Sequence, residues 1–279
     1  MTGFGERVRG ALAQSGPLCV GVDPHPGLLA AWGLPTSAEG VRTFGLRVVE
    51  AASASPAGII KPQVSFFERF GSAGLAALED VMRAGREGGL IVIADAKRGD
   101  IGSTMQAYAE AWLTPGSPLE ADALTVNPYL GVGALSSAAE LAYAHGKGLF
   151  ALVATSNPEA VALQRSQRQD GRTVARAVLD ELGAINADHT RAGEWGSIGA
   201  VVGATVSWAE SGLVATDPPA PILAPGFGFQ GARADDLQRI FGEAAPTVIA
   251  SESRSILAAG PDRLVETIRE RSEQYGSTP

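Results

Sequence analysis

Short apolar runs recur along the whole chain, and the segments between them repeat apolar residues every three or four positions. The short runs are rich in Val, Ile, Leu and Ala, which predicts parallel strands buried on both faces. The longer segments have the period of amphipathic helices. We expect strands at 18–22, at 58–60, from 90 onward, and at 123–126, 149–154, 198–202, 221–224 and 247–250.

The same periodicity predicts the helices. A short one over 4–14 could cover one end of the fold, and Thr36-Ser37-Ala38-Glu39 fits a capping box that opens the next helix. The others are expected at about 65–86, 101–112 and 173–192, with one ending near 145 and a last one from Pro261.

The spacing of the strands predicts the architecture. Their starts are about 33 residues apart on average, close to the ~30 residues of a βαβ unit. Eight such units in 279 residues fit a closed (β/α)8 TIM barrel with a short N-terminal helix better than a doubly wound sheet. No linker divides the chain, so we expect a single domain over residues 1–279.

Composition narrows the class of ligand. The net charge is −8 with 22 Lys and Arg, which argues against a nucleic-acid partner but leaves a small anionic ligand open. Cys19 is the one cysteine, so no internal disulfide can form, and its apolar strand predicts simple packing. Residues 1–13 lack the apolar core of a signal peptide, and no run is long enough to cross a bilayer. We expect a cytoplasmic protein with no membrane contact.

Polar residues follow nearly every predicted strand. In a barrel the carboxyl ends of the strands meet at one mouth, where the active site lies. A rim with a purely structural role would not require polar residues after so many strands. The residues at these ends are Asp23, Lys61, Asp95 with Lys97, Asn127, Ser156, Thr205, the glycine-rich 225–231 loop and Arg254.

The third strand ends in the densest group of charges. Asp95 and Lys97 are two residues apart and should project from the same face, and Asp100 follows on the turn. With Lys61, this predicts two cations and two anions near one point. An isolated Asp-x-Lys could equally be an ion pair that closes a strand. A further anion beside Asp95 would be costly unless the reaction removed it, as loss of CO2 does, and a lysine there could protonate the resulting carbanion.

The seventh and eighth strands predict a phosphate site. Glycines at 226, 228 and 231 let backbone N–H groups approach an anion, and Arg254 offers a fork that fits phosphate oxygens. A glycine loop alone is more often only a turn, so the pairing with Arg254 carries this interpretation. The three histidines lack ligand spacing, which predicts no metal site, and no nucleophile elbow or Walker lysine is present.

The stretch from Asp95 to Thr104 resembles the D-x-K-x-x-D-I-x-x-T signature of the orotidine 5'-phosphate decarboxylase family. The similarity covers almost the whole chain, and its length and the segments 127–129 and 154–158 look like the longer bacterial branch. The other matching positions are Asp23, Lys61, Ser156, Pro225-Gly226, Gln230-Gly231 and Ser253-Arg254.

The resemblance implies cofactor-free decarboxylation of orotidine 5'-monophosphate to UMP, the last step of de novo pyrimidine synthesis. By this analogy Lys97 donates the proton to C6 of the pyrimidine and Asp95 lies against the substrate carboxylate. Lys61 would orient the charges and contact the ribose. Asp100 and Thr104 would reach into the neighbouring subunit's site, which implies a homodimer.

The resemblance also implies the binding residues. Asp23 would bind ribose hydroxyls, Ser156 the pyrimidine edge, and Gln230 and Arg254 the phosphate. Phe229, directly before Gln230, departs from the pattern and puts the loop's phosphate contacts in question.

Two alternatives remain open at this point. Metal-dependent phosphosugar enzymes on the same barrel also carry the D-x-K-x-x-D segment, but they hold Mg²⁺ with a Glu at the end of strand two, where this chain has Lys61. A non-catalytic barrel that only binds nucleotide is the second, although every charge of the expected quartet is present.

Overall fold

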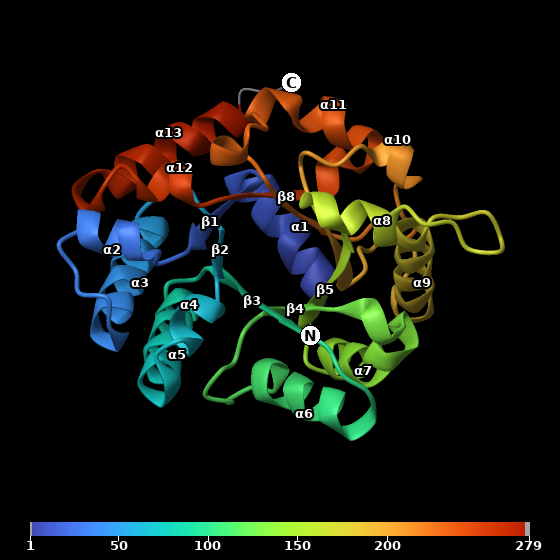
Figure 1. Ribbon diagram of the computed structural model, residues 1–279, viewed down its shortest axis with the longest axis horizontal. Helices are drawn as coiled ribbons and strands as arrows, with labels where there is room; N and C mark the ends of the chain where they lie inside the picture. The colour runs from blue at the N-terminus through green and yellow to red at the C-terminus, as the bar shows by residue number, and fades with distance from the viewer. Residues whose placement is uncertain (1, 277–279) are drawn as a thin grey trace.

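The chain forms a closed barrel of eight parallel strands in sequence order, with β8 returning to pair with β1 (Figure 1). The computed structural model describes residues 2–276, so Met1 and 277–279 lie outside it. The expected (β/α)8 architecture is confirmed. The strands are β1 (Leu18–Val22), β2 (Ile59–Pro62), β3 (Ile91–Arg98), β4 (Ala123–Val126), β5 (Gly148–Ala154), β6 (Ile198–Val202), β7 (Ile222–Pro225) and β8 (Val248–Glu252).

Helices surround this ring of strands (Figure 1). They present apolar stripes to the barrel, while the strands, covered on both faces, are buried along most of their length. The helices are α1 (Phe4–Ser15), α2 (Pro26–Ala31), α3 (Ala38–Ser53), α4 (Ser65–Glu68), α5 (Gly71–Glu87), α6 (Gly102–Leu113), α7 (Ser136–Ala144), α8 (Val161–Gln164), α9 (Val174–His189), α10 (Trp208–Ser211), α11 (Leu237–Phe241), α12 (Arg254–Leu257) and α13 (Leu264–Gly276).

Helix α1 closes the bottom of the barrel, as expected from its position before the first strand. Figure 1 shows it across the middle of the ring of strands. Its Phe4 and Val8 are fully buried against the residues that fill the barrel interior, among them Cys19 and Phe150. The rings of Phe4 and Phe150 meet edge to face at 5.8 Å. Helix α1 thus covers one end of the barrel, and the strands finish at the opposite end.

Two local predictions were wrong. The expected helix over 65–86 is two helices, α4 and α5, because Gly71 adopts a left-handed φ of +61° and turns the chain between them. The helix expected to open at the Thr36–Glu39 capping box is α3, and it is capped by Ser37 rather than Thr36, since the Ser37 Oγ accepts a hydrogen bond from the Gly40 N–H. Pattern and spacing predicted that helices exist here, whereas their ends depend on single backbone angles.

None of the helices within residues 2–276 is both long enough and apolar enough to span a membrane.

Candidate active site

Asp95 lies between two lysines at the C-terminal mouth of the barrel. Its Oδ2 is 2.8 Å from the Lys61 Nζ and its Oδ1 is 2.5 Å from the Lys97 Nζ. Asp95 and Lys97 therefore do project together from β3, as their two-residue spacing predicted. The side chains of Lys61 and Asp95 are 6% and 10% exposed, whereas that of Lys97 is 45% exposed. Lys97 is the member of this group that a ligand can reach most easily.

The two lysines hold Asp95 in its charged form. Burial by itself would raise the pKa of the Asp95 carboxyl, but the charges and hydrogen bonds of Lys61 and Lys97 outweigh it and place this pKa well below its usual range. Burial would likewise lower the pKa of Lys61, yet the charges of Asp95 and Asp23 raise it. At neutral pH the mouth thus contains a buried carboxylate and a buried ammonium, each stabilised by the other.

The backbone around Lys97 is irregular. Lys97 has a φ of +50° and is the only non-glycine residue with positive φ between residues 2 and 276. Ala94 of β3 is paired with Leu124 of β4, and the next pair is Arg98 with Val126. Strand β3 therefore has more residues than β4 between these two pairs, which is a β-bulge. This bulge turns Lys97 toward the carboxylate two residues before it, a use of bulges that is common beside active sites.

Thr125 on β4 holds this arrangement, and the sequence pattern did not single it out. Its hydroxyl accepts a hydrogen bond from the Lys97 N–H at 2.9 Å and donates one to the Asp95 Oδ1 at 3.0 Å, and the residue is 1% exposed. The Gln63 Nε2 also donates to the Asp95 carbonyl at 3.2 Å. The one signal in the sequence was a hydroxyl within the apolar run 123–126.

Asp23, at the end of β1, is close enough to Lys61 to raise its pKa. Its Oδ1 is buried and has no hydrogen-bond partner in the part of the chain that the structure describes. A buried carboxylate oxygen without a donor is costly in an isolated protein. This oxygen is suited to accept a hydrogen bond from a ligand.

The glycine loop and Arg254 lie side by side at the ends of β7 and β8, where Pro225 pairs with Ser251. Gly226, Gly228 and Gly231 all have positive φ, so the loop needs glycine to follow this path. The exposed Phe229, the departure noted in the sequence, packs under Arg254, whose Cζ is 3.8 Å from the ring centroid. Phe229 therefore supports the arginine by a cation–π contact.

Ser156 is exposed just beyond β5 and lies against Gly203, which follows β6. Thr155, the residue before it, is hydrogen-bonded to Gln164 of α8. The Gln164 side-chain amide accepts a hydrogen bond from the Thr155 N–H at 2.8 Å and donates one to the Thr155 Oγ1 at 3.0 Å. Gln230 is exposed in the short helical turn Gly228–Gln230. Both residues are available to a ligand at the mouth.

Asp100 does not join the charged group within one chain. The Asp100 Oδ1 accepts a hydrogen bond from its own neighbour, the Ile101 N–H, at 2.8 Å, and the carboxylate has no ion pair within residues 2–276. Within one chain the ion-paired group consists of Lys61, Asp95 and Lys97. Thr104, on the first turn of α6, is exposed.

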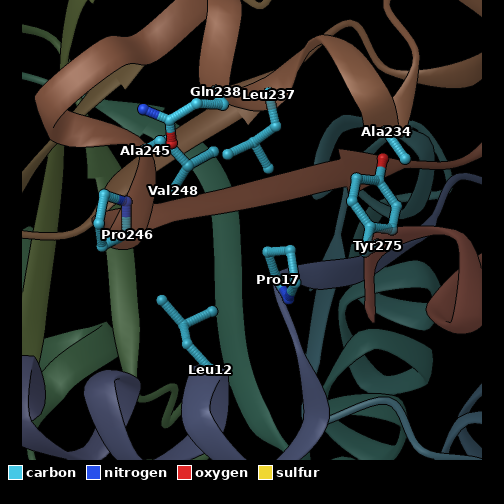
Figure 2. A pocket seen from close by; sticks show the side chains of 9 residues that line it. All are labelled: Leu12, Pro17, Ala234, Leu237, Gln238, Ala245, Pro246, Val248 and Tyr275. Carbon is cyan, nitrogen blue, oxygen red and sulfur yellow. The ribbon is translucent and has the colours of Figure 1, made fainter. Parts of the chain in front are cut away.

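A separate pocket at the other end of the barrel does not fit this chemistry. Figure 2 shows it between α1, the start of β1 and the start of β8, with Leu12, Pro17, Val248 and Tyr275 among its lining residues. None of its lining residues within 2–276 is charged. The charged mouth is the candidate active site.

The fold and the site define a class. A (β/α)8 barrel with a Lys/Asp group, a glycine loop after the seventh strand and an arginine after the eighth has the plan of barrel enzymes that act on phosphorylated small molecules. No three His, Cys, Asp or Glu side chains among residues 2–276 are grouped so that they could hold a metal ion.

Comparison with known proteins identifies the family within this class. The model of the orotidine 5'-phosphate decarboxylase / HUMPS family matches residues 16–267. The chain is 53% identical to the orotidine 5'-phosphate decarboxylase of Salinispora arenicola over 94% of this chain and 92% of the relative. It is 48% identical to that of Streptomyces coelicolor over 99% and 96%. The chain belongs to this family.

Solved structures agree with this assignment. A crystal structure of a protein from Streptomyces avermitilis superimposes with a TM-score of 0.92 at 46% identity, covering 99% of this chain and 96% of that one. The OMP decarboxylase of Leishmania donovani superimposes with a TM-score of 0.77 at 28% identity, covering 99% and 98%. The resemblance found in the D-x-K-x-x-D-I-x-x-T stretch thus extends over the whole barrel.

Proposed function

We propose that this protein is a carboxy-lyase that converts orotidine 5'-monophosphate to UMP and CO2 without a cofactor, the last step of de novo pyrimidine synthesis. The observation that carries the proposal is the buried Asp95 held between Lys61 and Lys97. The high identity to relatives that bear this activity in their names supports it over nearly the full chain.

The charges at the mouth supply a driving force for decarboxylation. A substrate carboxylate placed beside Asp95 would bring two anions together. At a separation of 4 Å and an effective dielectric of 20 this costs about 4 kcal/mol. Breaking the C6–carboxyl bond releases neutral CO2 and leaves the electron pair on C6, so the repulsion is relieved as the reaction proceeds. The Lys97 Nζ then transfers a proton to C6, and Lys61 keeps Asp95 ionised throughout.

The remaining residues bind parts of the substrate that do not react. Arg254 and Gln230 hold the phosphate beside the glycine loop, and the unpartnered oxygen of Asp23 accepts from ribose hydroxyls, near which Lys61 also lies. Ser156 contacts the edge of the pyrimidine. Because the phosphate is remote from the bond that breaks, its binding energy can be used to orient the base against Lys97.

We further propose that the active unit is a cytoplasmic homodimer of one-domain chains in which Asp100 and Thr104 complete the partner's site. In one chain Thr104 is exposed and Asp100 is half-buried. Large apolar side chains that follow β3 and β4 are also exposed: Ile101, Tyr108, Tyr129 and Leu130 are 61%, 36%, 74% and 55% exposed. A second copy of the chain would cover these side chains. Mixing Lys97→Ala with Asp100→Ala protein should then restore activity, and no recovery after subunit exchange would exclude the shared site.

The test of the reaction is the ultraviolet absorbance of orotidine 5'-monophosphate incubated with the purified protein and EDTA. We expect the absorbance to fall and UMP to accumulate. If the substrate persists in EDTA but is consumed when Mg²⁺ is added, the protein belongs with the metal-dependent members of the fold. If nucleotide binds without any turnover, the decarboxylase proposal fails.

A further inference from the structure

A buried carboxylate that takes no part in the proposed chemistry lies directly behind the glycine loop. Glu252 is the last residue of β8, and its side chain is completely buried. Its Oε1 accepts from the Arg271 Nη2 and the Tyr275 hydroxyl, each at 2.7 Å. Its Oε2 accepts from the Arg271 Nε at 2.9 Å and the Ser255 hydroxyl at 2.6 Å. We refer to these four residues as the Glu252 cluster.

Arg271 and Tyr275 keep their protons at neutral pH. Burial would lower the pKa of Arg271, but its hydrogen bonds and charge contact with Glu252 raise it. Burial raises the pKa of Tyr275 above its usual value, and the neighbouring Glu252 raises it further, so the phenol remains a donor. All four donors to Glu252 are therefore permanent. Such a group is rigid, because each oxygen of the carboxylate is held from two directions.

The glycine loop rests on this cluster. A Cβ atom added to Gly228 would lie 2.5 Å from the Ser255 Oγ and 2.6 Å from the Glu252 Oε2, so only glycine allows the loop to come this close. One residue earlier, the buried Phe227 ring meets the Tyr275 ring edge to face at 5.8 Å. Two consecutive residues of the loop, Phe227 and Gly228, thus contact the Glu252 cluster.

The Glu252 cluster also contacts α12, the helix that carries Arg254. Ser255 directly follows Arg254 in α12, and its bond to Glu252 anchors the first turn of that helix. Arg254 in turn packs over Phe229 of the loop. Through Gly228 on one side and Ser255 on the other, one carboxylate sets how far the loop lies from the guanidinium.

We propose that Glu252 is a positioning residue for the substrate phosphate, because it keeps the glycine loop and Arg254 at the spacing at which both reach one phosphate group. This inference rests on the proposed function, which assigns the phosphate to these two elements. A cluster that merely fastened α13 to the barrel would affect stability alone. One that positions the phosphate site must affect ligands with a phosphate more than ligands without one.

The experiment compares UMP with uridine, which differ only by the phosphate. Their dissociation constants are measured by titration calorimetry for the wild type and Glu252→Gln. Glutamine keeps the size of the side chain but loses the charge. We expect the dissociation constant of UMP to rise about tenfold, equivalent to ~1.4 kcal/mol, and that of uridine to stay the same. With orotidine 5'-monophosphate, KM should rise more than kcat falls.

Asp122→Asn is the matched control. Asp122, like Glu252, is a buried carboxylate, but it lies at the opposite end of the barrel. Its ion-pair partners are Arg7 and Lys147. This variant should lose stability and still prefer UMP over uridine as the wild type does. If Glu252→Gln does not fold, Ser255→Ala and Tyr275→Phe, which each remove one hydrogen bond to Glu252, decide by the same ratio of dissociation constants.

Two results are separable. A wild type that prefers UMP, together with folded variants that keep the same preference or lose affinity for both ligands equally, overturns the positioning role and leaves the decarboxylase proposal intact. A wild type that binds UMP no better than uridine overturns the phosphate site itself, and the role of Glu252 with it.

Discussion

The barrel buries a group of charged residues at each end. The two groups differ in whether every charge and hydrogen-bond acceptor has a partner within the chain. At the mouth, Asp95 is paired with Lys61 and with the half-exposed Lys97, and the nearby Asp23 has a buried oxygen without a partner. At the bottom, the Asp122 Oδ1 is paired with Arg7 at 2.7 Å and faces Lys147 at 3.7 Å.

The bottom group is complete in itself. The second oxygen of Asp122 accepts from the Val92 N–H at 2.9 Å, and Lys147 is paired with Glu120 at 2.7 Å. These bonds join α1 to the starts of β3, β4 and β5. Burial of charge therefore does not by itself mark an active site. The distinguishing property is a charge or acceptor that the fold leaves free for a ligand. Of these two groups, as described within residues 2–276, the one at the mouth has it.

The difference between the two ends can be tested most directly by removing one lysine from each. Lys97→Ala should lower kcat by at least about 100-fold, the low end of the contribution of a positioned proton donor, and should leave the fold intact because the side chain is 45% exposed. Lys147→Ala should leave kcat unchanged and lower the melting temperature. Steady-state kinetics and thermal unfolding of both variants test this, and near-normal kcat in Lys97→Ala would exclude it as the proton donor.

The bottom group should in turn matter for stability. Asp122→Asn removes the charge that faces Arg7 and Lys147 while both cations stay in place. Breaking a buried ion pair in this way costs about 3 kcal/mol. Urea unfolding should show this loss, with kcat unaltered at temperatures where the variant is folded. A lower kcat in the folded variant would mean that the two ends of the barrel are coupled.

Thr125 offers a smaller and more specific test at the mouth. Thr125→Val keeps the shape of the side chain but leaves the Lys97 N–H without its acceptor and Asp95 with one donor fewer. Two hydrogen bonds at about 1 kcal/mol each correspond to a kcat about 10-fold to 30-fold lower. Thr125→Ser, which keeps the hydroxyl, should retain most of the activity. Equal kcat values for the valine and serine variants would exclude this role.

The smallest expected effect is the pH dependence of the stability that the mouth contributes. The pKa of Asp95 is lower in the folded protein than in the unfolded one. Its contribution is therefore present above about pH 4, the unfolded value, and is lost as the pH falls toward the folded value. The pKa of Lys61 is raised, so its contribution is complete below about pH 10 and is lost as the pH rises through the folded value.

The stability lost in Asp95→Asn should accordingly be constant from about pH 5 to about pH 9 and should shrink near pH 3. Urea unfolding of the wild type and the variant at several pH values measures this difference. A difference that grew on acidification would show that Asp95 is not held ionised by its lysines.

The order of the strands, the barrel and the charged residues at its mouth could all be predicted from the sequence. Burial patterns and residue spacing are local properties, and eight apolar runs at regular intervals permit few arrangements. The two-residue spacing of Asp95 and Lys97 predicted that their side chains meet, because alternate positions of a strand face the same way. In the structure a bulge at Lys97 brings the two side chains together. The family signature is carried by the same short stretch.

Other features depend on how distant segments pack together. Thr125 reaches Asp95 because β4 pairs with β3 in one register and with one bulge, and no local pattern encodes that register. Asp100 lies beyond the end of β3, and its carboxylate accepts a hydrogen bond from the Ile101 N–H and pairs with neither lysine of the group within residues 2–276. Glu252 meets Tyr275, 23 residues later, only because α13 folds back over the end of β8. Contacts between residues far apart in sequence are set when the barrel closes, and for that reason composition and periodicity could not predict them.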